Sequence, residues 1–304
     1  MLDYQAILEE IYSSLKKTKD TGEVASYIPE LAKIPKDKLG IHLQLITGED
    51  FAVGDALEKF SIQSISKVFS LSKAFQLVGN KILTRVDVEP SGNPFNHLSL
   101  LELENGIPRN PLINSGAIVM ADILLSNLKN PKEDFLNFVR ELAHDDSISY
   151  NEKVAESERE TGFNNFAAAN LLKSFGNLEN DIDDVLDFYF HQCSIMMNCK
   201  QLTNAFFVYA NRGKCLKNVL HLTPSQVKRI NAIMLTCGFY DEAGEFAFEV
   251  GLPGKSGVGG GIVALLPHCF TIATWAPALN PQGNSYLGMQ ALEQFTTKTK
   301  LSIF

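Results

Sequence analysis

Residues 61–80 read SIQSISKVFSLSKAFQLVGN. Apolar residues occur on nearly every side of it, and Gly79-Asn80 ends the run, which predicts a buried helix. The preceding residues 40–60 alternate around the turn Gly48-Glu49-Asp50, as in a β-hairpin. We therefore predict a buried helix that the chain enters directly from a sheet.

The remaining periodicity separates a helical middle from strand-rich ends. Helical patterns occur at 165–175, 182–197 and 200–211, and Thr223-Pro224 predicts the start of a helix that ends at Gly238. Residues 244–277 predict three antiparallel strands, and ALEQFTTKTK (291–300) predicts a terminal helix. The expected fold class is α/β of the α+β kind, with an antiparallel sheet flanked by helices plus a helical lobe. We expect one domain over 1–304, with a sheet lobe at about 1–85 and 222–304, a helical lobe at about 86–221, and a cleft between them.

Composition excludes several kinds of partner. The 304 residues carry a net charge of −8 and no basic patch, which disfavours nucleic acid and anionic membranes. The start lacks the basic residues and unbroken apolar run of a secretory signal. The most apolar stretch, 261–279, is interrupted by Pro267, His268 and Pro277, so we expect no membrane span.

The five cysteines show no C-x-x-C spacing, which indicates reduced thiols and a cytoplasmic protein. His191, Cys193 and Cys199 are imaginable metal ligands, but they lie along an apolar helical pattern and lack a second ligand pair. We expect no metal and no cofactor.

The spacing Ser-x-x-Lys is common in this chain and decides nothing alone. It occurs at Ser13, Ser14, Ser64, Ser70, Ser126 and Ser225. Ser64 lies in the first turn of the predicted helix, where unpaired backbone amides favour developing negative charge, and Lys67 follows one turn later on the same side. Ser70 lies nearly two turns in, where a hydroxyl usually bonds its own helix. We expect chemistry at Ser64 and Lys67, and an ordinary helix at Ser70 and Lys73.

A second candidate motif is GLPGKSGVGGG at 251–261. It fails as a phosphate-binding P-loop, because Glu249 occupies the first glycine position and a strand follows in place of a helix. Lys255-Ser256-Gly257 matches the K-[ST]-G element that accompanies S-x-x-K in penicillin-recognising serine enzymes. The glycines predict a close approach of another backbone, although a glycine bulge with an ordinary lysine remains an alternative. The S-D-N element of β-lactamases is absent.

With these motifs assembled, the sequence resembles the serine-dependent glutaminase family, which has a serine β-lactamase-like fold. The resemblance runs from Tyr27-Ile28-Pro29 almost to the C-terminus. It is carried, in order, by FSIQSISK, EPSGNPFN, NPLINSGAI, SERETGFNNFA, DFYFHQCS, TCGFYDEAGEFAFEVGLPGKSGVGGGIVA and GNSYLGMQALEQ. The first two dozen residues lie outside it, and the ankyrin repeats of larger animal relatives are missing.

The resemblance implies hydrolysis of L-glutamine to L-glutamate and ammonia, with no cofactor. Ser64 would be the nucleophile, Lys67 its activating partner and Tyr240 a proton relay, while Lys255 would give electrostatic support. The amides of Ser64 and Val258 would form the oxyanion hole. The residues implied for glutamine binding are Tyr27, Ser64, Asn114, Glu158, Asn165, Tyr189, Tyr240 and Val258. Glu158 would offset the α-ammonium, and the asparagines and tyrosines would hold the α-carboxylate.

Alternatives remain open at this point. Tyr189 follows the core-like Phe188, Asn165 fits a helix cap, and Arg159 and Glu160 fit structural or solvated roles. A β-lactam hydrolase or peptidase of the same fold would keep the chemistry and change the substrate. An amino-acid sensor would keep the pocket and lose turnover. Similar proteins form dimers or tetramers, so we expect a homodimer or homotetramer, although no stretch identifies the interface.

Overall fold

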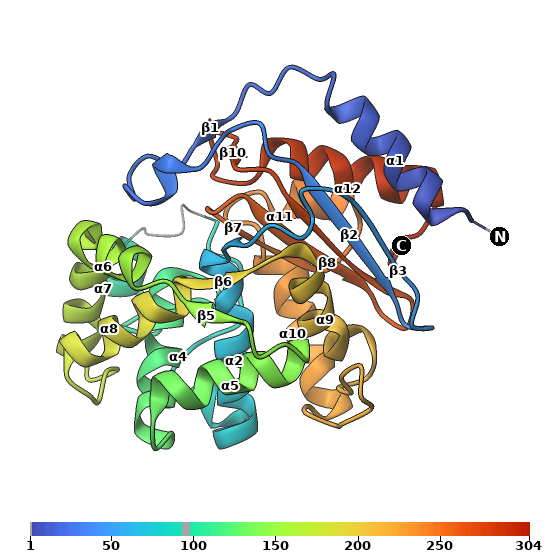
Figure 1. The fold of residues 1–304 in the computed structure, drawn as a ribbon. Coiled ribbons are helices and arrows are strands. Elements are labelled where there is room, and N and C mark those ends of the chain that lie inside the picture. Colours follow the sequence, from blue (N-terminus) through green and yellow to red (C-terminus); the bar gives the residue numbers. More distant parts are fainter. Residues whose placement is uncertain (1, 93–97) are drawn as a thin grey trace.

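The centre of the fold is a five-stranded antiparallel sheet built from both ends of the chain (Figure 1). The computed structural model describes residues 2–92 and 98–304. The strand order is β3-β2-β9-β8-β7, with bounds β2 Gly40–Leu45, β3 Asp50–Gly54, β7 Gly254–Gly257, β8 Gly261–Leu266 and β9 Phe270–Trp275. β2 pairs with β9 from Gly40 opposite Trp275 to Leu45 opposite Phe270. The predicted pairing of the two ends in one sheet is confirmed, as is the β2–β3 hairpin.

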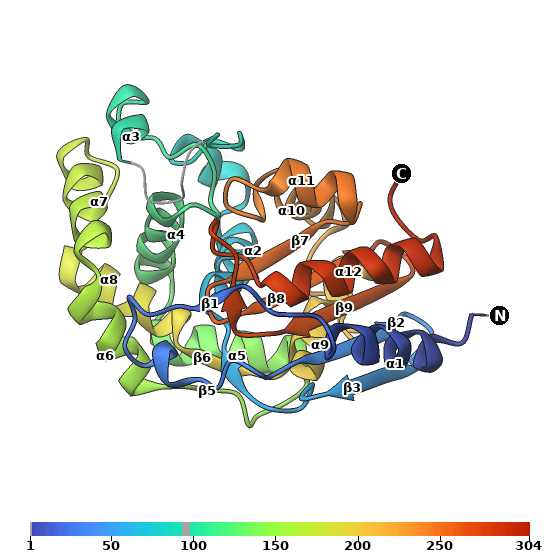
Figure 2. The same cartoon turned by 90° about the horizontal axis from the view of Figure 1, so that it is seen from above.

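Helices cover both faces of this sheet. Side chains on successive strand residues point to opposite faces, so apolar residues on each face pack against the helices on that side. Helices α1 (Tyr4–Leu15) and α12 (Tyr286–Thr299) lie side by side over one face, as Figures 1 and 2 show. Their core includes Ile262 and Ala264 of β8. Val263 and Leu265 point the other way, into the core that contains α9 (Cys199–Ala210). Apolar cores therefore cover both faces of the sheet, and β8 is apolar along its whole length.

Helix α2 (Ser66–Val78) runs through the larger of the two cores. A 3₁₀ turn, η2 (Gln63–Ile65), joins it to the short strand β4 (Phe60–Ser61). It packs against α4 (Asn114–Asn127) and α10 (Pro224–Cys237), among others. The predicted buried helix after a strand is confirmed, but Ser64 lies in the 3₁₀ turn ahead of the α-helix and not in its first turn.

The other elements surround this helix or extend from it. Their bounds are β1 Glu23–Val24, η1 Leu31–Lys33, η3 Gly79–Thr84, α3 Ser99–Leu103, α5 Pro131–Ala143, β5 Ser149–Tyr150, α6 Glu152–Thr161, α7 Phe163–Ser174, α8 Ile182–Cys193, β6 Ile195–Met197, α11 Ala243–Glu249 and β10 Ala278–Leu279. The motif EPSGNPFN lies partly within 93–97, outside the described residues. The described helices include none with the length and apolarity to cross a membrane.

Two sequence-based predictions of secondary structure are wrong. The helix expected over 182–197 ends at Cys193, because residues 195–197 form β6, which pairs with both β4 and β5. Residues 244–249, expected to begin a strand, belong to helix α11. Their alternating phenylalanines imitate a strand, yet only Phe246 is buried, stacked on Phe239, while Phe248 is exposed. In both places tertiary contacts override the local pattern.

Candidate active site

Ser64 is held at a sharp turn between a strand and a helix. The preceding Gln63 has φ of 50°, in the left-handed region that non-glycine residues rarely adopt. Both residues are buried, with 9% of Ser64 and 2% of Gln63 exposed. The turn therefore presents Ser64 immediately before α2, whose next turn carries Lys67.

Lys67 is almost completely buried and has defined partners. Its Nζ donates to Asn114 Oδ1 at 2.6 Å and to the carbonyl of Leu112 at 3.3 Å. Burial lowers the pKa of Lys67 from 10.5 to about 8, while Glu158 and Cys193 act in the opposite direction. Burial is therefore the main cause of the lowered pKa of Lys67.

Lys255 lies on β7 and is buried as deeply as Lys67. Its Nζ donates to the carbonyls of Ser256 at 2.7 Å and Gly238 at 3.0 Å. The ammonium lies 4.8 Å from the ring centroid of Tyr240. Burial, and secondarily the charge of Lys67, hold the pKa of Lys255 well below its ordinary value. Lys255 thus contacts the ring of Tyr240, and the positive charge of Lys67 contributes to its lowered pKa.

The glycine-rich segment after Lys255 lies directly against the chain that leads to Ser64. A Cβ on Gly257 would stand 2.5 Å from the carbonyl oxygen of Ile62, and one on Gly259 would stand 2.2 Å from that of Ser61. Distances this short exclude any side chain unless the backbone moves. The predicted close approach is therefore confirmed.

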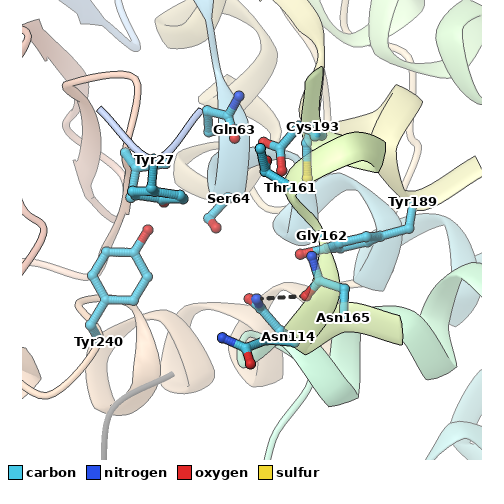
Figure 3. A pocket seen from close by; sticks show the side chains of 13 residues that line it. Tyr27, Gln63, Ser64, Asn114, Thr161, Gly162, Asn165, Tyr189, Cys193 and Tyr240 are labelled. Carbon is cyan, nitrogen blue, oxygen red and sulfur yellow. Dashed lines mark hydrogen bonds between the residues drawn. The ribbon is translucent and has the colours of Figure 1, made fainter. Parts of the chain in front are cut away.

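A cavity of about 390 Å³ opens at Ser64 (Figure 3). All eight residues implied for substrate binding line it, namely Tyr27, Ser64, Asn114, Glu158, Asn165, Tyr189, Tyr240 and Val258. They come from segments far apart in the sequence, including η2, α4, α6, α7 and α8. Lys67 and Lys255 are not among the lining residues. Five further lining residues were not expected from the sequence: Gln63, Thr161, Gly162, Asn164 and Cys193.

Two asparagines connect Lys67 to the cavity wall. Asn114 accepts from Lys67 through Oδ1 and donates through Nδ2 to Asn165 Oδ1 at 3.0 Å, the dashed line in Figure 3. Asn165 lies inside α7, whose N-cap residue is Gly162, so the alternative of a helix-capping asparagine is wrong. The pair forms a continuous polar path from the buried lysine to the cavity.

Glu158 is the acidic group of the cavity wall, and 8% of it is exposed. Burial raises its pKa to about 7, while a hydrogen bond from Gln63 and the charge of Lys67 favour the ionised form. Burying a carboxylate removes the water that solvates its charge, and this costs free energy. A cation bound beside Glu158 would offset that cost.

The tyrosines occupy different depths of the cavity. Tyr27 is 55% exposed, whereas Tyr189 on α8 is buried. Tyr240 has φ of 41°, and its hydroxyl interacts with Ser64 in a way that favours the ionised phenol. Burial raises the pKa of Tyr240, so its phenol stays protonated at neutral pH. Figure 3 shows the hydroxyl of Tyr240 directed toward Ser64.

The second serine-lysine pair has no part in this cavity. Ser70 is fully buried; its hydroxyl donates to Gln192 Oε1 at 2.6 Å and lies 3.3 Å from the carbonyl oxygen of Ser66. Lys73 lies 4.9 Å from the ring centroid of Phe138. The prediction that this pair belongs to an ordinary helix is confirmed.

The sequence predicts no catalytic or metal-binding role for three other residues, Arg159, Cys193 and Cys199. Arg159 pairs with Asp183 at 2.8 Å on the surface. Cys193 and Cys199 are buried, and burial raises the pKa of the Cys193 thiol to about 12. Among residues 2–92 and 98–304, no cluster of three potential metal ligands occurs.

The unexpected lining residues had weak signals in the sequence. Thr161, Gly162 and Asn164 lie within the quoted motif SERETGFNNFA, between Glu158 and Asn165. Gln63 adjoins the nucleophile position, but only the folded turn brings its carboxamide to Glu158. Cys193 follows an apolar helical pattern and reaches the cavity because α8 ends there.

The fold and the site define a hydrolase-like protein of the serine β-lactamase-like class, and comparison with known proteins gives its family. The glutaminase family model matches residues 22–304. The chain is 55% identical over 304 residues to a glutaminase of Christiangramia forsetii, with all of both chains covered, and 55% identical to one of Saccharophagus degradans, with 100% of this chain and 99% of that protein covered.

Solved structures agree with this match. A probable glutaminase, ybaS, superposes with a TM-score of 0.94 at 33% identity, covering 99% of this chain and 97% of the other. A Bacillus glutaminase superposes with a TM-score of 0.91 at 31% identity, covering 99% of this chain and 100% of the other. The chain belongs to the glutaminase family of enzymes, and the predicted fold class is confirmed.

Proposed function

We propose that this protein hydrolyses L-glutamine to L-glutamate and ammonia through a γ-glutamyl ester on Ser64. The observation that carries the proposal is one cavity in which Ser64 lies with a buried carboxylate, three asparagines and three tyrosines. These are the groups that an amino-acid head group and a reactive carboxamide require. No bound metal enters the scheme.

Activation of the nucleophile is assigned to Lys67. A neutral amine has two N–H groups and one lone pair, and the two acceptors of Lys67, on Asn114 and Leu112, use both N–H groups. The lone pair is left to accept the proton of the Ser64 hydroxyl. The pKa of about 8 supports this role, because a useful fraction of the amine is neutral near physiological pH.

Tyr240 is assigned to proton transfer. Its phenol lines the same cavity as Ser64 and remains protonated, so it can donate its proton to the departing ammonia. The amino group of Lys255 lies beside the ring of Tyr240, and in its protonated form it gives electrostatic support by favouring negative charge on the phenol oxygen when that proton leaves. Water then attacks the ester. The base is the Tyr240 phenolate, or Lys67 after its ammonium has given a proton to that phenolate, and the protonated lysine or the newly protonated base returns a proton to the Ser64 oxygen as the ester breaks.

The oxyanion of the tetrahedral intermediate is assigned to the amides of Ser64 and Val258. Both residues line the cavity, and the glycine contacts keep the segment of Val258 against the turn of Ser64. Fixed backbone donors of this kind stabilise developing charge without reorganisation. This explains why the segment that contains Val258 is so rich in glycine.

The remaining polar residues are assigned to the amino-acid head group. Glu158 pairs with the α-ammonium, and Asn114, Asn165, Tyr27 and Tyr189 surround the α-carboxylate. Burial supports the pairing, because a desolvated carboxylate gains more from a cation than an exposed one does. The substrate would therefore be a free amino acid with an unblocked head group.

Mass spectrometry of the enzyme quenched during turnover of glutamine tests this scheme. A γ-glutamyl adduct on the peptide that contains Ser64 is expected, together with ammonia release. An adduct elsewhere, or turnover without Ser64, would refute it. A chromogenic β-lactam tests the rival hydrolase, and an absence of ammonia release would favour an amino-acid sensor.

Assembly and location are also part of the proposal. We expect a homodimer or homotetramer, which sedimentation equilibrium would measure. We also expect a cytoplasmic enzyme, because all five cysteines are free thiols and four of them are buried. Fractionation of cells that make the protein would test its location.

A further inference from the structure

Ser61 is a buried serine near the cavity that the mechanism above does not use. It lies on β4 with 2% of its surface exposed. Its Oγ donates to the carbonyl oxygen of Cys193 at 2.8 Å and accepts from Gln63 Nε2 at 3.0 Å. Ser61 therefore connects the C-terminal end of α8 to the residue before the nucleophile.

The bond with Cys193 fixes the orientation of the Gln63 carboxamide. A carbonyl oxygen only accepts hydrogen bonds, so the single hydroxyl hydrogen of Ser61 is committed to Cys193. A lone pair of Ser61 then faces Gln63, and the amide must present Nε2 to it. The flipped amide would bring two oxygens together without a hydrogen between them, which is unfavourable in a buried site.

The same carboxamide acts on Glu158. A primary amide nitrogen carries two hydrogens, and one of those on Gln63 is donated to Ser61. Gln63 and Glu158 line the same cavity, and the Gln63 side chain favours the ionised form of Glu158. The backbone of Gln63 is fixed by its turn at φ of 50°. The orientation of this one amide thus decides whether Glu158 meets a donor or an oxygen.

We propose that Ser61 is a positioning residue of the ammonium subsite, which fixes the Gln63 carboxamide and so aligns the Glu158 side chain for the substrate's α-ammonium. The inference rests on the proposed function, which assigns the α-ammonium to Glu158. Ser61 touches neither the substrate nor the reacting atoms. Its effect reaches the substrate through Gln63 and Glu158.

The other groups around Glu158 determine how much depends on this amide. Lys67 on α2 supplies the nearby positive charge. Cys193 and Tyr189 on α8, with Tyr27 and Tyr240 on loops, are the titratable groups whose pKa values Glu158 raises. They are neutral near pH 7 and offer no countercharge. Loss of the Gln63 donor would leave Lys67 alone to favour ionisation of Glu158, and would raise the pKa of Glu158 above its value of about 7.

The test variant is Ser61→Ala, which removes the acceptor that selects the amide orientation. We expect the KM for glutamine at pH 7 to rise about fivefold to tenfold, the scale of one hydrogen bond to a charged group. We expect kcat to change much less, and the acidic limb of kcat/KM to move to higher pH. Ser61→Thr keeps the hydroxyl and should restore the parent values.

Ser72→Ala is the matched control. Ser72 is also a fully buried serine with two hydrogen-bonding partners, at 2.7 Å from the carbonyl of Val68 and 2.7 Å from the hydroxyl of Tyr209, but it lies outside the cavity lining. It should lower the melting temperature without moving KM or the pH profile. A fall in melting temperature alone in Ser61→Ala, as in this control, would overturn the inference.

Calorimetric binding of L-glutamate and of glutarate, which lacks the amino group, separates this inference from the proposed function. If Glu158 binds the α-ammonium, the parent enzyme prefers L-glutamate, and Ser61→Ala narrows that preference by the same factor as the KM change. No preference in the parent would refute the assignment of Glu158. A preference that is unchanged in Ser61→Ala would refute the role of Ser61 alone.

Discussion

Ser64 and Ser70 lie in one segment, and a lysine follows each of them three residues later. Ser64 occupies a 3₁₀ turn at the cavity, and Lys67 bonds Asn114 on the cavity wall. Ser70 lies inside α2 and bonds Gln192 away from that cavity. The comparison shows that the spacing of a motif carries less information than the backbone that presents it.

The two lysines differ as much as the two serines. Lys67 is enclosed, and burial lowers its pKa. Lys73 is partly exposed and lies over the ring of Phe138, where its charge interacts with the aromatic face. A base needs the first environment, and a surface-facing helix lysine has the second. Substitutions at equivalent positions of the two pairs therefore give matched tests.

The largest expected effect is that of Ser64→Ala. Removing the nucleophile should lower kcat about 10⁴-fold or more, as is typical when a covalent mechanism loses its attacking group. The measurement is release of ammonia from glutamine under saturating substrate. Ser70→Ala serves as the control. It should retain turnover within about twofold, since the Ser70 hydroxyl is buried between helices and lies outside the cavity. Normal turnover in Ser64→Ala would refute the covalent mechanism.

Lys67→Arg should have the next largest effect. Arginine keeps the positive charge but does not lose its proton in proteins, so it cannot act as the base. We expect kcat to fall about 10³-fold, within the range for loss of a general base. Lys73→Arg preserves the contact with Phe138 and should stay within about twofold of the parent. Equal activity of the two variants would remove Lys67 from the proton transfer.

Gly257→Ala tests the contact that distinguishes the Ser64 turn from the Ser70 helix. The added Cβ would stand 2.5 Å from the carbonyl oxygen of Ile62, so the strand or the turn must move. A shift of this kind at the reacting groups should lower kcat/KM about 10²-fold. Gly244→Ala is the control, because nothing lies within 4 Å of its Cβ. Comparable losses in both variants would mean that the close approach is unimportant.

The pH dependence should separate the two pairs by a smaller factor. Lys67 must be neutral and Glu158 ionised, and both conditions are met above their pKa values of about 8 and about 7. As pH falls below 8, kcat/KM should decrease about tenfold per unit, and more steeply below 7. Ser70→Ala should keep this profile unchanged. Activity that stays constant from pH 6 to 9 would contradict both assignments.

The sequence was sufficient for the overall fold and for most of the cavity, for identifiable reasons. The run of apolar residues over 61–80 predicted α2, and the capping signal Thr223-Pro224 predicted α10. Both signals can be read from neighbouring residues along the chain. Resemblance to a family supplied Tyr27 and Glu158, which no local pattern connects. The secondary-structure predictions that were wrong depended on contacts with residues far away in the sequence. One example is the strand at 195–197, which forms because β4 and β5 pair with it.

The same limit applies to Gln63 and Ser61. Neither residue type predicts chemistry, and the left-handed φ of Gln63 is a property of the folded turn. The carboxamide matters because Ser61, Cys193 and Glu158 come together around it. Contacts of this kind come from sheet pairing and helix ends, which the order of residues along the chain does not give.

Ser70→Ala should have the smallest effect on activity but a clear effect on stability. For stability, the substitution of Ser70 should therefore matter more than that of Ser64. Ser70→Ala removes the donor of a 2.6 Å bond to Gln192 Oε1. An unpaired buried acceptor should lower the free energy of unfolding by about 1–3 kcal/mol, which exceeds the small gain in helix propensity. Ser64→Ala, at a cavity wall, should change it by less than about 0.5 kcal/mol. Urea denaturation measures both values.

The double variant Ser70→Ala/Gln192→Leu decides whether this loss comes from the unpaired acceptor. Replacing both partners by apolar groups is often nearly neutral, so the second substitution should recover part of the stability. Gln192 is 1% exposed, and its Nε2 has no hydrogen-bond acceptor within the described residues, so the pair contributes only through Oε1. If the double variant were less stable than Ser70→Ala, the packing of Gln192, and not its bond to Ser70, would hold these helices together.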